Sequence, residues 1–201
     1  MIRVLLAEDQ DMVRGALAAL LSLEDDIEVV AEVDRGDEIV GTAQRTRPHI
    51  ALLDIEMPGL DGITAAASLR EALPECRVLI LTTFGRPGFL RRAMAQGASG
   101  FLLKDAPADE LAVAIRRTMA GERVVDPNLA AQALSAGESP LSPREREVLL
   151  ASADGASVAQ VAQRLFLSEG TVRNHLSAAI QKLEARNRVE AARIAEEQGW
   201  L

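Results

Sequence analysis

The chain is 201 residues long, which is more than one hydrophobic core usually needs and suits two domains of ordinary size. It is 48% hydrophobic and 26% charged, so most of it is expected to fold. The sequence has neither an apolar run of membrane-spanning length nor a signal-peptide pattern, which predicts a cytoplasmic protein without a membrane partner. The single cysteine excludes an internal disulfide, and the two histidines and one cysteine have no zinc-site spacing. The net charge of −8 argues against a wholly basic surface for binding nucleic acid.

The first 120 residues predict an α/β domain built on a parallel sheet. Five short apolar runs occupy residues 2–7, 27–31, 50–53, 78–81 and 100–103. Segments with helical periodicity lie between and after them, as with Leu111, Ile115 and Met119 at i, i+4 and i+8. Because repeated strand and helix units cover both faces of a sheet, we expect a doubly wound five-stranded parallel sheet with helices on both sides.

Residues 121–140 differ in character and are predicted to be a linker. Glycines and prolines surround a short alanine-rich stretch: Gly121, Pro127, Gly137 and Pro140. The alanine-rich stretch is expected to be helical after Asp126. This linker would separate a first domain at 1–120 from a second domain at 141–201.

Residues 141–201 predict a small all-α domain of four helices. Ser142 and Glu145 form a capping-box pattern that opens the first helix, and Ser168 and Asn187 are positioned to cap the third and fourth. The third helix carries a core stripe of Val172, Leu176, Ile180 and Leu183. A tight turn at 166–168 predicts a helix-turn-helix, whose second helix enters the major groove of duplex DNA.

Polar residues follow the predicted strands at their carboxyl ends, where open parallel sheets bind ligands. They are Glu8 and Asp9 after the first strand, Asp54 at the third, Thr82 at the fourth and Lys104 after the fifth. Three carboxylates at one edge repel one another and favour a hard divalent cation such as Mg²⁺. An aspartate can also accept a phosphoryl group, with a metal and a lysine to neutralise charge. Singly, such residues are usually turn or cap residues, so the combination carries the prediction.

These residues, with Met57-Pro58-Gly59 after the aspartate, resemble the receiver family of two-component response regulators, and the resemblance covers residues 2 to about 120. It implies that Asp54 is the phosphoacceptor. It also implies that Glu8 and Asp9 hold Mg²⁺, together with the backbone carbonyl of Glu56.

The receiver resemblance also implies a switch. Lys104 matches the lysine that contacts the phosphoryl group, Thr82 the switch hydroxyl, and Phe101 the aromatic residue that reorients with it, although a buried aromatic also fits a purely structural role. Glu8 stands where aspartate is commoner, and Asp105 stands where proline often follows the lysine. Neither departure removes a group that the chemistry requires.

A second resemblance covers residues 141 to about 195. LSPREREV at 141–148 and LSEGTVRNH at 167–175 resemble the LuxR-type four-helix DNA-binding domain. The resemblance implies that Thr171, Val172 and Arg173 face the DNA and that Asn174 and Lys182 meet backbone phosphates. Gly170 stands where many members carry lysine, so the preferred DNA sequence is the property least transferable from the family. Basic residues over 164–193 outnumber acidic ones, which predicts a local basic surface.

Together the resemblances predict a DNA-binding transcriptional response regulator. Phosphorylation of Asp54 by a sensor histidine kinase would favour a homodimer that binds double-stranded promoter DNA at two half-sites. Candidates for the dimer contacts are the receiver surface around the last two strands and helices, or else the first and fifth helices. On DNA, the fourth helix of the C-terminal domain is expected to pair with its copy in the partner molecule.

Two alternatives keep some of these features. Asp54-x-Glu56 is loosely similar to aspartate-nucleophile phosphohydrolases, but those place an Asp-x-Asp pair after their first strand, so an enzyme is not expected. Alternatively, DNA binding is independent of phosphorylation and the receiver is an interaction or ligand-binding module. The complete acidic pocket with Thr82 and Lys104 argues against this second alternative.

Overall fold

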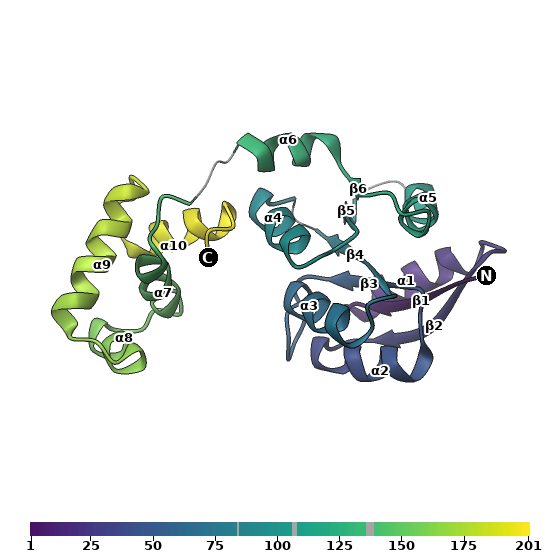
Figure 1. Ribbon diagram of the computed structural model, residues 1–201, viewed down its shortest axis with the longest axis horizontal. Coiled ribbons are helices and arrows are strands. Elements are labelled where there is room, and N and C mark those ends of the chain that lie inside the picture. The colour runs from purple at the N-terminus through teal and green to yellow at the C-terminus, as the bar shows by residue number, and fades with distance from the viewer. Residues whose placement is uncertain (84, 106–107, 136–138) are drawn as a thin grey trace. The chain divides into compact units, whose positions relative to one another are not determined.

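The computed structural model describes residues 1–83, 85–105, 108–135 and 139–201 (Figure 1). The chain divides into two compact units, Met1–Gly85 with Leu90–Ala130, and Arg86–Phe89 with Ala131–Leu201. None of the helices in these described ranges is long and apolar enough to cross a membrane.

The first unit is built on a parallel sheet with strand order β2-β1-β3-β4-β5-β6. The strands are β1 (Ile2–Ala7), β2 (Ile27–Val33), β3 (Ile50–Asp54), β4 (Arg77–Thr82), β5 (Gly100–Leu103) and β6 (Val124–Val125). Up to residue 135 of the chain, the helices are α1 (Asp11–Leu21), the 3₁₀ helix η1 (Gly36–Glu38), α2 (Ile39–Thr46), α3 (Gly62–Ala72), α4 (Pro87–Ala95), α5 (Ala108–Met119) and α6 (Pro127–Ser135), of which α4 and α6 each have residues in both units.

The central strands are apolar because both faces of the sheet are covered. Every residue of β3 is buried. On one face, Val4, Leu6 and Leu52 pack with residues of α1 and α5 in a single core, while α2 and α3 pack together and contact strands of the sheet. The predicted doubly wound parallel sheet is therefore confirmed.

The sheet has six strands among the described residues, one more than predicted. β6 pairs with β5 through Gly100↔Val124 and Phe101↔Val125. A run of two valines is too short for periodicity to identify, and the pairing depends on glycine: a Cβ on Gly100 would lie 2.8 Å from the carbonyl oxygen of Val124. The region predicted as a linker therefore contributes to the sheet.

Helix α6 also lies inside the predicted 121–140 linker. Asp126 accepts a hydrogen bond from the backbone N–H of Leu129 at 2.9 Å, which opens the helix where Asp126-Pro127 predicted it. Residues 136–138 of the predicted linker lie outside the described residues.

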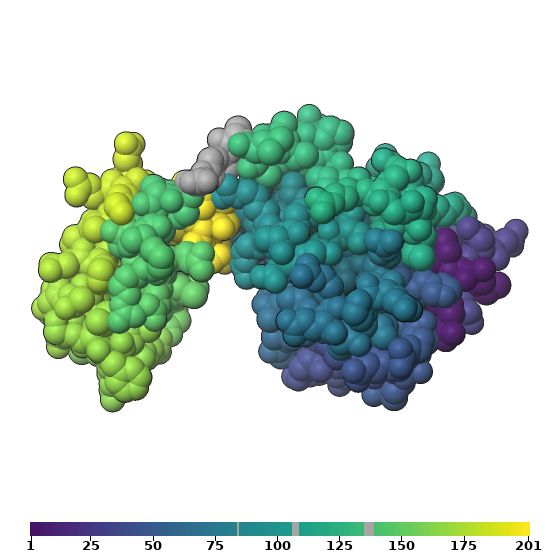
Figure 2. Space-filling model, in the orientation of Figure 1, coloured from purple at the N-terminus to yellow at the C-terminus, as the bar shows by residue number. Residues whose placement is uncertain are grey.

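The helices from residue 143 onward are α7 (Pro143–Ala151), α8 (Val158–Leu165), α9 (Glu169–Lys182) and α10 (Arg188–Glu197). They surround one apolar core to which all four contribute. Figure 2 shows the outer surface of these helices in green to yellow. Ser142, Ser168 and Asn187 cap helices as predicted, and Ser157 with Gln160 forms a second capping box. The predicted all-α four-helix architecture is confirmed.

Candidate functional site

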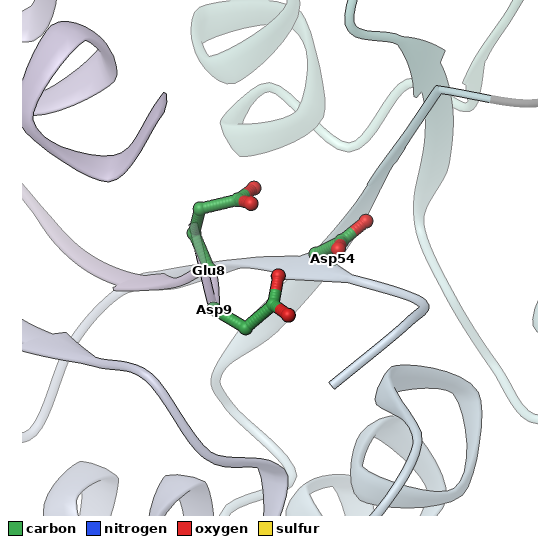
Figure 3. A group of neighbouring side chains, drawn as sticks. All are labelled: Glu8, Asp9 and Asp54. Atoms are coloured by element: carbon green, nitrogen blue, oxygen red, sulfur yellow. The ribbon is translucent and has the colours of Figure 1, made fainter. Parts of the chain in front are cut away.

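Three carboxylates meet at the carboxyl edge of the sheet (Figure 3). Glu8 and Asp9 follow β1, and Asp54 is the last residue of β3. Each offers one oxygen within 4.8 Å of the others. Glu8 and Asp54 are buried, at 1% and 4% exposed, whereas Asp9 is exposed to solvent. The structure therefore brings together the residues that the strand-end pattern selected.

The ammonium of Lys104 lies between the two buried carboxylates. Its Nζ is 2.5 Å from Glu8 Oε2 and 3.1 Å from Asp54 Oδ1. The backbone N–H of Lys104 donates to the carbonyl oxygen of Thr82 at 2.8 Å, which fixes the lysine to the end of β4. Glu8 therefore contacts the lysine directly.

Burial raises the pKa of Asp54 above the ordinary value of an aspartate. The attraction and hydrogen bond of Lys104 act in the opposite direction, while the negative charge of Glu8 adds to the increase. A carboxylate that is poorly stabilised as an anion is a stronger nucleophile and a better ligand for a cation. The environment of Asp54 thus favours both roles predicted for it.

The side chains at this edge fit a hard divalent cation. Three carboxylates and one ammonium leave an excess of negative charge, and Glu8 Oε2, although close to Lys104, is buried without an aligned hydrogen bond. Oxygen ligands of this kind suit Mg²⁺. Glu8, Asp9 and Asp54 are the side chains that would hold it, and exposed Glu56 follows β3 by two residues, where its backbone carbonyl was predicted to help.

One residue that shapes this edge was missed from the sequence. Gly62 begins α3, and a Cβ there would lie 1.8 Å from the carbonyl oxygen of Asp54. Only glycine lets the loop after β3 return beneath the aspartate. Asp61 next to it caps α3 by accepting hydrogen bonds from the N–H groups of Ile63 and Thr64, both at 3.1 Å, and this Asp-Gly pair is the signal that was available.

The two predicted switch residues lie on neighbouring strands. Thr82 ends β4 and is 2% exposed, and Phe101 in β5 has no exposed surface. The register places Phe101 beside Ile80 and Thr82 beside Leu103. Phe101 is therefore part of the core in this conformation, and the switch roles of both residues stay predictions.

The predicted DNA contacts lie on α9, but not all on one face. Arg173, Asn174 and Lys182 are exposed and Thr171 is half-buried. Val172 has no exposed surface, because the helical period places it in the core with Leu176 and Ala179. This corrects the expectation that Val172 faces DNA.

Lys182, predicted to meet phosphates, makes an ion pair within the protein. Its Nζ donates to Glu145 Oε2 at 2.7 Å, and the same carboxylate oxygen accepts from the backbone N–H of Ser142 at 2.7 Å. The hydrogen bond from Lys182 lowers the pKa of Glu145. Glu145 thus ties the start of α7 to the end of α9, a contact between residues too distant in the sequence to predict.

Family models match both parts of the chain. The model for the response regulator receiver domain matches residues 4–116, and the model for bacterial regulatory proteins of the luxR family matches residues 139–195. The acidic edge lies within the first match and α9 within the second.

Individual relatives match over nearly the full length. The transcriptional regulatory protein DesR of Bacillus subtilis (strain 168) is 46% identical over 201 residues, covering 100% of each chain. The response regulator protein VraR of Staphylococcus aureus (strain COL) is 33% identical and covers 94% of each. Among solved structures, the response regulator ChrA of a heme-sensing two-component system is 39% identical, with coverage of 100% and 98% and a TM-score of 0.59.

A further solved structure is RcsB from Salmonella enterica serovar Typhimurium, bound to promoter P1flhDC in the presence of the phosphomimetic BeF₃⁻. It is 25% identical, covers 98% of each chain and has a TM-score of 0.72. The family models and these relatives describe transcriptional regulators, which removes the phosphohydrolase alternative. The chain belongs to the LuxR family of two-component response regulators, which join a receiver domain to a helix-turn-helix DNA-binding domain.

Proposed function

We propose that this protein is a cytoplasmic transcriptional regulator that is switched by phosphorylation of Asp54 and binds promoter DNA as a dimer. The observation that carries the proposal is the acidic edge, where Glu8, Asp9 and Asp54 offer oxygens within 4.8 Å of one another beside Lys104. RcsB, a relative of the same architecture, has been solved on a promoter with a phosphomimetic, which supports the link between phosphate and DNA.

The carboxylate of Asp54 acts as the nucleophile. Its oxygen attacks the phosphorus of a phosphohistidine on a sensor kinase, the P–N bond breaks as the O–P bond forms, and the histidine nitrogen takes up a proton. Mg²⁺, when bound, neutralises charge on the phosphoryl oxygens. Lys104, already 3.1 Å from Asp54 Oδ1, then forms an ion pair with the new phosphoryl group.

Thr82 and Phe101 couple the phosphoryl group to the output. Thr82 ends the strand next to Asp54 and can donate its hydroxyl to a phosphoryl oxygen, while Phe101 adapts its packing on the neighbouring strand. Such coupling requires an element with two conformations, and phosphorylation shifts the equilibrium between them. The arrangement favoured by phosphate exposes a dimer surface, and two paired domains read two half-sites about one helical turn apart.

Beryllofluoride, which mimics the phosphoryl group, is expected to raise both self-association and DNA affinity when it is added with Mg²⁺. The molar mass in solution is measured by light scattering, and the affinity for a duplex selected by the protein from a random pool is measured by fluorescence anisotropy. Asp54→Asn is the control, since it removes the carboxylate that holds the mimic. If the mimic binds yet neither property changes, the receiver acts as an interaction module and the phosphorylation switch is wrong.

Lys104→Ala is expected to leave part of the phosphorylation and to uncouple it from dimerisation. The ammonium contacts both Glu8 and Asp54 and is joined through its backbone to β4, so its loss separates the phosphoryl group from the strands that respond to it. Phosphoprotein is quantified on a phosphate-affinity gel and compared with the mass in solution. All samples contain Mg²⁺, because the variant leaves buried carboxylates without a partner. Dimerisation of the phosphorylated variant equal to wild type would contradict this role.

A further inference from the structure

Both cationic side chains of α9 are held by carboxylates in the free protein. Arg173 donates from Nη2 to Glu169 Oε2 at 2.6 Å, one helical turn away. Lys182 contacts Glu145 at 2.7 Å. The basic residues that predicted a DNA surface are therefore largely neutralised on this helix, in a chain whose net charge is −8.

The pair formed by Arg173 and Glu169 is the one on the open surface of the helix. Their side chains are 61% and 48% exposed, whereas the side chain of Glu145 is 9% exposed and belongs to the packing of α7 against α9. Residues four apart in a helix share a face. A duplex that meets Arg173 therefore meets the carboxylate of Glu169 as well.

Glu169 acts on Arg173 in two ways. Its hydrogen bond restricts the rotamers of a long side chain, so the guanidinium loses less conformational entropy when it binds a base in one orientation. Its negative charge repels backbone phosphates, and Arg173 must give up a charge-assisted hydrogen bond before pairing with one. Phosphate contacts are the same on every duplex. The repulsion of phosphates and the loss of this hydrogen bond therefore both weaken non-specific binding to DNA.

Hydrogen bonds also hold Thr171 in the first turn of α9. Ser168 Oγ accepts a hydrogen bond from the backbone N–H of Thr171 at 3.1 Å and lies 2.8 Å from Thr171 Oγ1. The hydroxyl of Thr171 is thus oriented by a residue three positions earlier, as Arg173 is by one four positions earlier. The side chains at the start of α9 are positioned before any DNA binds.

We propose that Glu169 is a specificity-determining residue, which positions Arg173 for base contacts and suppresses binding to DNA of unrelated sequence. The inference rests on the proposed DNA-binding function of α9. A bidentate contact with a base, made while the ion pair with Glu169 is kept, offsets the phosphate repulsion only at the correct site. The carboxylate therefore widens the difference between the affinities for specific and random duplexes.

Glu169→Gln tests this role because it removes the charge and keeps the length of the side chain. Affinity for a random duplex is expected to rise about two- to fivefold, which corresponds to the range measured for exposed ion pairs. A released Arg173 adds one phosphate contact, so the slope of log affinity against log salt steepens by about 0.9. The ratio of specific to random affinity is expected to fall. Fluorescence anisotropy over about 50 to 200 mM salt measures all three quantities.

The matched control is Glu147→Gln on α7. Glu147 pairs with Arg144 on its own helix, and its side chain is 48% exposed, as that of Glu169 is, so the variant makes an identical change in net charge outside α9. An equal increase in random binding by both variants would mean that net charge alone is responsible and would overturn the proposal. A specificity ratio unchanged by Glu169→Gln would overturn it too.

A second variant covers the case in which Glu169→Gln disturbs the helix. Glu169→Asp keeps the charge but shortens the reach to Arg173, so it should retain weak random binding and lose part of the specific affinity. Random binding as strong as in Glu169→Gln would contradict the proposed repulsion. Failure of the wild-type protein to bind any duplex would instead remove the proposed function itself, which keeps the two failures distinct.

Discussion

Asp54→Asn is expected to abolish phosphoryl acceptance and, at the same time, to raise the stability of the metal-free protein. An amide cannot attack phosphorus, so acceptance falls to the background of the assay. The stability gain follows from the raised pKa of Asp54, because burial disfavours its ionised form in the folded state only. Above that pKa the anion costs stability, and the cost disappears as pH falls through it.

The gain in stability should appear near neutral pH and vanish in acid. An effect of about 1 kcal/mol corresponds to a rise in Tm of about 2 to 4 °C for a chain of this size. Thermal unfolding is measured in chelator, and Mg²⁺ is then added. The wild-type protein should gain stability from the ion and Asp54→Asn should gain less, because binding to the folded state alone stabilises it.

Asp25→Asn is the control for this experiment. Asp25 is an exposed aspartate between α1 and β2, so the same chemical change there should leave phosphorylation, Tm and the Mg²⁺ response unchanged. Formation of phosphoprotein at the normal rate in Asp54→Asn would show that the phosphoacceptor lies elsewhere. A lower Tm without metal would contradict the argument from burial.

Arg173→Ala is expected to weaken binding to the specific duplex by about 1 to 3 kcal/mol, or about five- to 150-fold. Arg173 is exposed on α9, and its guanidinium fork suits two acceptors on one guanine edge. A much smaller effect is expected on random DNA. Anisotropy titrations with the two duplexes at one salt concentration measure the difference.

Arg144→Ala is the control. Arg144 lies on α7, outside the predicted DNA-binding helix, and like Arg173 it pairs with a glutamate on its own helix. The control should leave the specificity ratio unaltered. Equal losses on specific and random DNA for Arg173→Ala would indicate a phosphate contact, and unchanged affinity for both would remove Arg173 from the interface.

The sheet and its acidic edge were predictable because the signals are local and repeated. A strand buried on both faces must be an apolar run, as β3 is, and parallel strands bring their carboxyl ends to one edge. The position of Asp54 beside Glu8 follows from that topology alone. Their shared contact with Lys104 depends on side-chain reach, which the sequence does not encode as a pattern.

Contacts between segments that are far apart in the sequence could not be predicted, because no local pattern links the two partners. Lys182 had the charge expected of a phosphate contact, but its partner Glu145 lies on another helix.

Arg173 and Glu169 are four residues apart, so their pairing could be predicted from helical spacing. Val172 shows the limit of transferring a motif, because its place in the helical repeat sends the side chain into the core.

The short strand β6 also covers a sheet edge that could otherwise pair with strands of other molecules. A parallel sheet that ended at β5 would present the N–H and C=O groups of Gly100–Leu103 along an open edge, which is a template for strands of other molecules. β6 covers part of this edge with two residues, and Pro127, which lacks an N–H, follows soon after. A receiver fragment cut at residue 120 would lose that cover, so recombinant fragments that keep residues through α6 should be less prone to aggregate through strand addition.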